Sequence, residues 1–158
     1  MTKPKVVIDT NVFIHALFYN KPECIKIMDL IEADAVELYF ARDMIGELMY
    51  ILKNFAIPNL SQSEGIELLE KFAGLFYISR SVNILKVNPP TLPKDQDDIM
   101  FLKCAYKANV DYLITNDGTS GLFSITGYSF NIVTAADFVK AMVPQAEVQE
   151  TKTEEEAG

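Results

Sequence analysis

The sequence predicts an α/β fold in which helices cover a mainly parallel sheet. Short runs of β-branched and aromatic residues alternate along the chain with segments of helical apolar periodicity. This alternation is typical of parallel strands joined by right-handed crossovers. The chain has 158 residues, 49% of them apolar, which suits one domain with a substantial core. We therefore expect a single domain over residues 1–143 and a separate tail over residues 144–158.

The first half of the chain contains two expected strands. Residues 5–8 form the first, because three successive β-branched residues suit a strand buried on both faces. Asp9 follows this strand directly, and Asn11 is expected to cap the next helix. The other elements expected here are a helix beginning at Pro22, a strand over residues 36–40, a helix over 42–55 and a helix opened by a capping box from Ser61 to Glu64.

The second half begins with a short expected strand over residues 81–87 and a proline-rich connection over 88–93. Asp95 is expected to cap a helix that ends near Asn109. The elements expected after it are a strand over 111–115, a helical turn over 119–123, a strand over 129–133 and a helix over 134–142. The tail has almost no apolar content, so we expect it to be disordered.

Composition excludes several classes of function. The net charge is −8, of which the last fifteen residues supply −4, so a strongly basic nucleic-acid footprint is absent. Any contact with nucleic acid must then use local Lys and Arg or bound cations. The one histidine, His15, gives little support to a zinc site or a Ser-His-Asp triad. Cys24 and Cys104 lack CxxC spacing, so we expect both to be buried in the core as free thiols. Such cysteines are typical of a protein in a reducing compartment.

The N-terminus lacks a segment typical of a signal peptide, and no run of about 18 apolar residues occurs. We therefore expect a soluble cytoplasmic protein without membrane contact.

Four acids are placed where they could converge: Asp9, Glu47, Asp98 and Asp117. Asp9 and Asp117 each come just after a buried strand, and the carboxyl ends of parallel strands share one edge of the sheet. Glu47 lies beside an apolar stripe, where a charge is costly unless it is paired or faces a polar cleft. Clustered carboxylates without thiols or imidazoles favour Mg²⁺ or Mn²⁺.

Each acid also has a purely structural interpretation. Asp9 and Asp117 could cap turns, and Glu47 could be a solvated helix residue. Asp95 could be an N-cap followed by Asp97 and Asp98 in the positive first turn of a helix. The metal-site interpretation is favoured because two of the acids follow strands of the same sheet.

Four motifs occur in a fixed order: Val7-Ile8-Asp9-Thr10-Asn11-Val12-Phe13, then Glu47, then Asp95-Gln96-Asp97-Asp98-Ile99-Met100-Phe101-Leu102-Lys103-Cys104-Ala105, then Asp111-Tyr112-Leu113-Ile114-Thr115-Asn116-Asp117. In these motifs the chain resembles PIN domains, and more closely the stand-alone prokaryotic PIN proteins grouped with VapC-like toxins. The resemblance covers roughly residues 5–142. It implies a Rossmann-like three-layer α/β/α sandwich and a Mg²⁺- or Mn²⁺-dependent ribonuclease acting on single-stranded RNA.

The resemblance also implies roles for particular residues. Asp9, Glu47, Asp98 and Asp117 match the acidic quartet of the family, and Asn11 and Thr115 match its supporting polar positions. Asp97 is the alternative to Asp98, and Asp95 is an additional candidate. Bound ions would clamp the scissile phosphate and activate a water molecule that Glu47 could orient. An antitoxin protein and a homodimer or higher oligomer are the partners implied. Residues 118–121 lack the basic residue often found there, which bears on substrate affinity.

Two other functions fit part of the sequence. One is a non-catalytic PIN-like module that binds RNA or protein. The other is a phosphatase or a receiver-like phosphoacceptor with an aspartyl nucleophile. Such a phosphatase would usually have D-x-D after the first strand, whereas Thr10-Asn11 follows Asp9. A receiver-like domain would need a lysine after a late strand, and Thr115-Asn116-Asp117 provides none.

Overall fold

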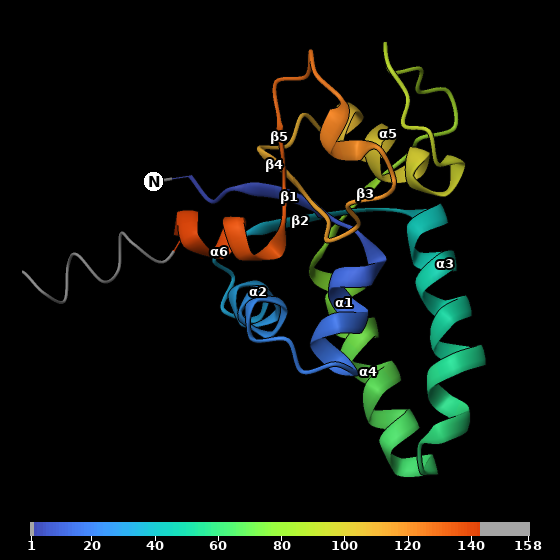
Figure 1. Ribbon diagram of the computed structural model, residues 1–158. Coiled ribbons are helices and arrows are strands. Elements are labelled where there is room, and N and C mark those ends of the chain that lie inside the picture. Colours follow the sequence, from blue (N-terminus) through green and yellow to red (C-terminus); the bar gives the residue numbers. More distant parts are fainter. Residues whose placement is uncertain (1, 143–158) are drawn as a thin grey trace, which may run out of the picture.

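The computed structural model describes residues 2–142, and these contain a five-stranded parallel sheet (Figure 1). The strands are β1 (Lys5–Ile8), β2 (Glu37–Ala41), β3 (Arg80–Val82), β4 (Tyr112–Ile114) and β5 (Asn131–Val133). Their order in the sheet is β3-β2-β1-β4-β5, and every neighbouring pair is parallel. The predicted α/β class with a parallel sheet is confirmed.

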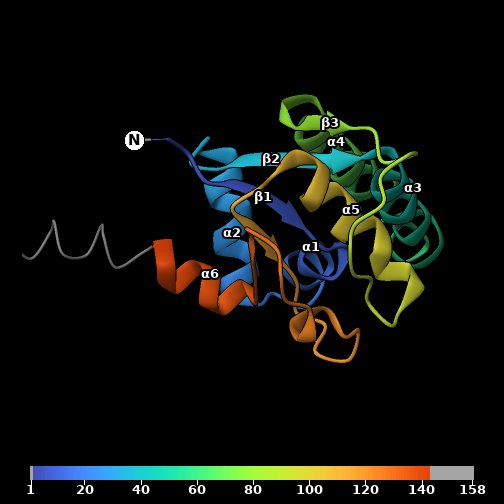
Figure 2. The ribbon, with the colours of Figure 1, turned by 90° about the horizontal axis from the view of Figure 1, so that it is seen from above.

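The helices are α1 (Thr10–Leu17), α2 (Pro22–Glu32), α3 (Arg42–Ile51), α4 (Gln62–Ile78), α5 (Ile99–Ala108) and α6 (Ala135–Met142). In the view of Figure 1, α1, α2, α4 and α6 lie below the sheet, whereas α5 lies above it against β1, β2 and β4. Figure 2 shows the same arrangement from above. The result is the expected three-layer α/β/α sandwich.

The first strand occupies the middle of the sheet, with β2 on one side and β4 on the other. Val6, Val7 and Ile8 are each 0% exposed, as the run of β-branched residues predicts for a strand covered on both faces. Where α1 and α4 pack against the sheet, the core is aromatic. The ring of Phe13 on α1 stacks on Phe40 of β2 and meets Phe72 of α4 edge-on. This packing fixes the end of β1, and therefore the position of Asp9.

Two local predictions were wrong. Asp9, not Asn11, is the N-cap of α1, because the Asp9 side chain accepts a hydrogen bond from the Asn11 backbone N–H. The strand expected over residues 81–87 is only Arg80–Val82. The helical segment predicted over 42–55 is present, with α3 over Arg42–Ile51 followed directly by a π-helical turn over Leu52–Ala56. Short apolar runs do not determine exact element ends from local sequence.

Other local predictions are confirmed. Ser61 and Glu64 form the predicted capping box of α4, and Asn109 ends α5 in the left-handed conformation with φ 50°. Cys24 and Cys104 are buried free thiols, and burial raises the pKa of Cys104 to about 12. No helix within residues 2–142 is long and apolar enough to cross a bilayer. The predicted acidic tail over 144–158 lies outside the described residues.

Candidate metal centre

Asp9 lies at the carboxyl end of β1, where the chain turns into α1. It is 5% exposed, and its backbone N–H donates to the carbonyl of Ile114 at the end of β4, with N and O 2.9 Å apart. The hydroxyl of Thr115 donates to Oδ2 of Asp9 over 2.7 Å. The first acid is therefore buried and held in a fixed orientation by the neighbouring strand.

Thr115 also holds Asp117. The backbone N–H of Asp117 donates to Oγ1 of Thr115 over 3.1 Å, so one hydroxyl contacts both acids. The carboxylate of Asp117 accepts hydrogen bonds from the backbone N–H and the hydroxyl of Thr119, at 2.9 and 2.7 Å. Asn11 contributes at the same edge, because its Oδ1 accepts from the backbone N–H of Asn116 at 3.4 Å. Both predicted supporting residues thus lie beside the predicted acids.

The structure brings three acids within reach of one ion. One carboxylate oxygen from each of Asp95, Asp98 and Asp117 lies within 4.8 Å of the other two. Asp98 ends a 3-10 turn (Gln96–Asp98) and leads into α5, and it is 5% exposed. Its Oδ2 is buried and has no hydrogen-bond partner among the described residues. A buried carboxylate oxygen without a donor is costly, so this atom needs a partner that residues 2–142 do not provide.

Asp95 reaches the cluster because the loop after Asp117 packs against the proline-rich connection. The backbone N–H of Asp95 donates to the carbonyl of Ser120 over 3.4 Å. Gly121, with φ +84°, follows Ser120, and a Cβ at Gly121 would lie 3.5 Å from the backbone nitrogen of Lys94. The left-handed conformation suits glycine, whereas a Cβ at this distance would make only an ordinary contact with Lys94. This contact joins two segments that the sequence analysis treated separately.

Glu47 and Asp97 lie outside the three-acid cluster. Glu47 is half-buried on α3, and one carboxylate oxygen accepts a hydrogen bond of 2.7 Å from the hydroxyl of Thr10. Asp97 is exposed and lines a hollow together with Glu47. Thr10 was not among the predicted site residues, although a hydroxyl directly after the first acid was a usable signal. Asp95 was predicted only as an additional candidate.

The charges of these acids affect one another. Burial raises the pKa of Asp9 to about 6, and the charges of Glu47 and Asp117 act in the same direction. Burial raises the pKa of Asp98 to about 7, with added repulsion from Asp9, Asp95 and Asp117. The pKa of Glu47 is also raised, mainly by burial. The pKa of Asp117 is lowered, because Thr119 donates two hydrogen bonds to its carboxylate.

The donor set fits a hard divalent cation. The cluster offers carboxylate oxygens, which are the ligands that Mg²⁺ and Mn²⁺ prefer. It contains no thiol or imidazole. A cation would give Asp98 Oδ2 a partner and would offset the repulsion that raises the pKa of Asp98.

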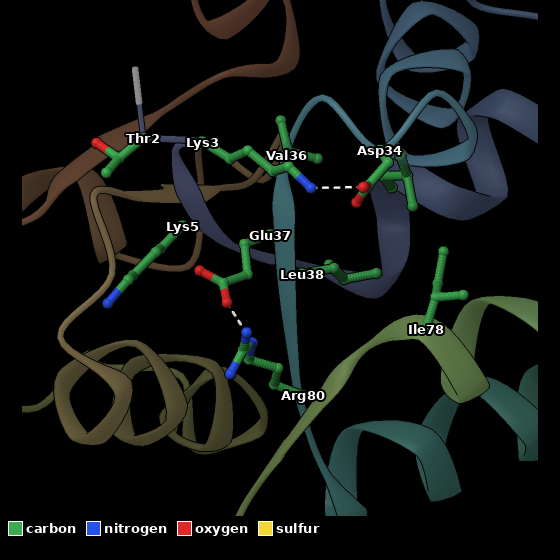
Figure 3. Close-up of a pocket in the computed structure, with 10 residues that line it drawn as sticks. Thr2, Lys3, Lys5, Asp34, Val36, Glu37, Leu38, Ile78 and Arg80 are labelled. Carbon is green, nitrogen blue, oxygen red and sulfur yellow. Dashed lines mark hydrogen bonds and ion pairs between the residues drawn. The ribbon is translucent and has the colours of Figure 1, made fainter.

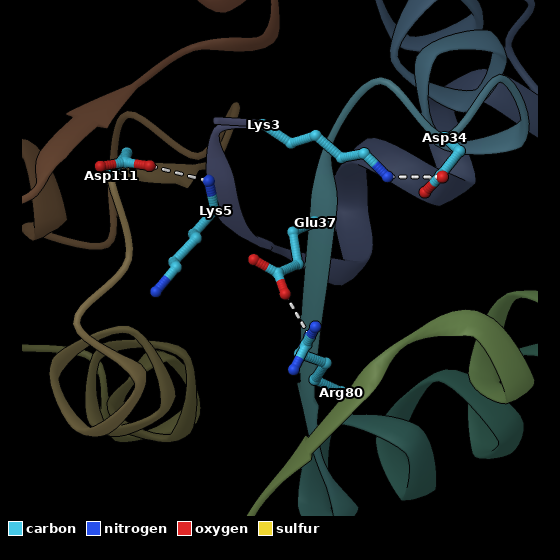
Figure 4. Close-up of polar contacts among 6 residues, drawn as sticks. All are labelled: Lys3, Lys5, Asp34, Glu37, Arg80 and Asp111. Carbon is cyan, nitrogen blue, oxygen red and sulfur yellow. Dashed lines mark hydrogen bonds and ion pairs between the residues drawn. The ribbon is translucent and has the colours of Figure 1, made fainter. Parts of the chain in front are cut away.

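A second charged hollow lies at the opposite end of the sheet, near the amino ends of β1 and β2 (Figure 3). Its charges are largely paired within the fold, because Lys3 contacts Asp34 and Arg80 contacts Glu37 (Figure 4). The backbone N–H of Lys5 donates to Asp111 over 2.8 Å. These contacts hold neighbouring segments of the sheet together, so we assign them a structural role. The acidic edge at the carboxyl ends of the strands is therefore the candidate site.

A parallel sheet with acids gathered beyond the carboxyl ends of its strands places the chain among the open-sheet α/β domains, whose functional sites lie at this edge. Within this class the chain belongs to the PIN domain family, because the model of the PIN domain matches residues 5–119. It is 32% identical over 118 residues to the uncharacterised protein MJ1680 of Methanocaldococcus jannaschii, covering 73% of this chain and 72% of that protein.

The fold is also similar to a solved structure, that of VapBC2 from Rickettsia felis bound to a DNA fragment from their promoter. The superposition has a TM-score of 0.54 and 12% sequence identity, and it covers 81% of this chain and 98% of that chain. At this identity the similarity describes the fold.

Proposed function

We propose that this protein is a Mg²⁺- or Mn²⁺-dependent endoribonuclease that hydrolyses phosphodiester bonds in single-stranded RNA. The observation that carries the proposal is Asp98: its Oδ2 is buried without a hydrogen-bond partner among the described residues, and one of its carboxylate oxygens lies within 4.8 Å of a carboxylate oxygen of both Asp95 and Asp117. A buried acid in this position is unfavourable in the absence of a cation. Membership of the PIN domain family supports a catalytic role for that cation in phosphodiester hydrolysis.

Asp98, Asp117 and Asp95 would hold the ion, and Asp9 would complete its acidic surroundings. When bound, a divalent cation polarises a phosphoryl oxygen and lowers the pKa of a bound water. Thr115 fixes the Asp9 carboxylate and the backbone at Asp117, so these acids need little reordering to bind.

Glu47 is proposed to orient the attacking water and to accept its proton. Its carboxylate accepts a hydrogen bond from Thr10 and is half-buried, and its charge acts on the neighbouring Asp9. The pKa of Glu47 is raised above its ordinary value, which makes a carboxylate a better proton acceptor near neutral pH.

The test combines a cleavage assay with a binding measurement. A labelled single-stranded RNA should be cut in Mn²⁺, left intact in EDTA, and cut again when Mn²⁺ is restored. Calorimetric titration of the metal-free protein with Mn²⁺ should show binding that Asp98→Asn weakens. Cleavage that persists after complete chelation would contradict the metal mechanism. RNA binding without cleavage in Mn²⁺ would favour the non-catalytic module instead.

We further propose that the protein acts as the toxin of a toxin–antitoxin pair and forms a homodimer or higher oligomer. Similarity in fold to the VapBC2 structure supports this. An apolar hollow lined by Phe18, Tyr19 and Phe55 also supports it, because these side chains are 38%, 66% and 65% exposed. Expression should arrest bacterial growth, and co-expression of the antitoxin should relieve the arrest. Light scattering gives the oligomeric state.

A further inference from the structure

Two hollows adjoin beside the candidate metal centre. One, of about 470 Å³, contains Glu47 and Asp97 in its lining, and the other, of about 460 Å³, contains Arg42 and Asn83. Both are also lined by Asp43, Ile84 and Lys103. Because they share these three residues, the hollows lie next to each other between the start of α3, the segment after β3, and α5, and we treat the pair as one groove. We call it the α3–α5 groove.

The sign of the charge changes along the α3–α5 groove. At one end the acids Glu47 and Asp97 are added to the shared Asp43 and Lys103, so carboxylates predominate. At the other end Arg42 is added to the same shared pair, so cations predominate. A chain of phosphates would meet favourable charge at the second end unaided, whereas at the first end it would need bound metal.

The two cations of the groove are not used by the fold. The ion pairs within residues 2–142 join Lys3 to Asp34, Lys71 to Glu32 and Arg80 to Glu37, and none of them involves Arg42 or Lys103. Arg42 is exposed, and Lys103 is half-buried. Among the described residues neither cation has an acidic partner in an ion pair, and both line the same groove, so both are open to an external anion.

The helices connect these cations to the acids. Arg42 precedes Glu47 by five residues on α3, and Lys103 lies on α5 five residues after Asp98, the N-cap of that helix. Five residues correspond to about 7.5 Å along a helix axis. Each cation is therefore carried by the same rigid element as an acid of the proposed site, and α3 contacts α5.

We propose that the α3–α5 groove binds single-stranded RNA on one side of the cleavage site, with Arg42 and Lys103 contacting phosphates that flank the scissile one. This inference rests on the proposed ribonuclease function and assigns two substrate-binding residues to it. The apolar side chains of Ile84 and Met100 line the groove and offer contacts to sugars and bases. A bidentate guanidinium and an ammonium suit phosphate recognition without sequence selectivity.

The test measures binding of a labelled single-stranded RNA by fluorescence anisotropy at several salt concentrations, with Ca²⁺ in place of Mn²⁺ to keep the RNA intact. The variants are Arg42→Gln, Lys103→Gln and the double change. Since each phosphate contact to a single strand contributes about 0.7 to the slope of log K against log salt, the double variant should lose about 1.4 of that slope. Arg42→Lys and Lys103→Arg should retain most of it.

Lys107→Gln is the matched control, because Lys107 is exposed on the same helix one turn beyond Lys103 and lines neither hollow. Calorimetric Mn²⁺ binding and the melting temperature of each variant establish that the fold and the acids are intact. If the double variant keeps the affinity and salt slope of the unaltered protein, the groove assignment is overturned and the ribonuclease proposal stands. If the unaltered protein neither binds nor cuts RNA, both are overturned.

Discussion

The hydroxyl of Thr115 lies 2.7 Å from Oδ2 of Asp9 and also accepts the backbone N–H of Asp117, 3.1 Å away. Thr115 is 0% exposed, so this hydroxyl is an internal brace between the ends of β1 and β4. We predict that Thr115→Val lowers the free energy of unfolding by about 1–3 kcal/mol, because buried polar groups lose their partner. Metal affinity should fall about 10–100-fold, as for other residues that orient metal ligands.

The measurements for Thr115 are urea unfolding and calorimetric titration with Mn²⁺. Thr115→Ser is the control, because it keeps the hydroxyl and removes only a methyl group, so it should retain most of the Mn²⁺ affinity. Unchanged Mn²⁺ affinity in Thr115→Val would show that the brace does not serve the metal.

Asp98→Asn should abolish cleavage while leaving the metal-free protein as stable as before, or more stable. Within residues 2–142, Asp98 makes no side-chain capping bond and its Oδ2 has no donor, and its neighbours are like-charged acids. A neutral amide relieves that repulsion. Added Mn²⁺ should raise the melting temperature of the variant less than that of the unaltered protein.

Asp97→Asn decides between the two adjacent acids, since Asp97 is exposed and lines the α3–α5 groove. Asp29→Asn, an exposed acid on α2, controls for loss of one negative charge. Full Mn²⁺ stabilisation of Asp98→Asn, together with loss of that response in Asp97→Asn, would assign the ligand to Asp97.

The metal-free protein should lose stability as the pH rises from about 4 to about 8. The pKa values of Asp9 and Asp98 are raised from 3.8 to about 6 and about 7 in the fold, so the folded state holds more protons than the unfolded state in this window. Their stabilising contribution is present below the unfolded value and is lost as the pH passes the folded values.

Denaturant unfolding at a series of pH values in EDTA measures this effect. The loss should be smaller in Asp98→Asn, which lacks the group with the higher pKa, and Mn²⁺ should reduce it in the unaltered protein. Identical pH profiles for Asp98→Asn and the unaltered protein would contradict the raised pKa.

Gly121→Ala should destabilise the fold by about 1–2 kcal/mol, because a non-glycine residue is strained at φ +84°. It should also weaken Mn²⁺ binding, since the loop holds Asp95 through the carbonyl of Ser120. Gly127→Ala is a matched control: Gly127 has φ +93°, and a Cβ there would have no neighbour within 4 Å. Similar loss of stability in both variants, with Mn²⁺ binding weakened only by Gly121→Ala, is the expected result of unfolding and calorimetric measurements.

Much of the fold was predictable from local patterns. The run of β-branched residues before Asp9 predicted a strand buried on both faces, and Val6, Val7 and Ile8 form it at the centre of the sheet. The ends of elements were less predictable, as the shortened β3 and the π-helical turn after α3 show. Packing between distant segments sets these ends, and it leaves little trace in neighbouring residues.

The sequence by itself determined the element order, the family resemblance, and the placement of Asp9 and Asp117 after strands that share a sheet edge. Only the tertiary structure decided which side chains meet: Thr115 with Asp9, 106 residues apart, Thr10 with Glu47, and Asp95 with the loop after Asp117. It also placed Asp98 in the cluster and Asp97 on the groove. Periodicity reports which face of an element is buried, whereas contacts between carboxylates and hydroxyls depend on loop closure and rotamers that packing selects.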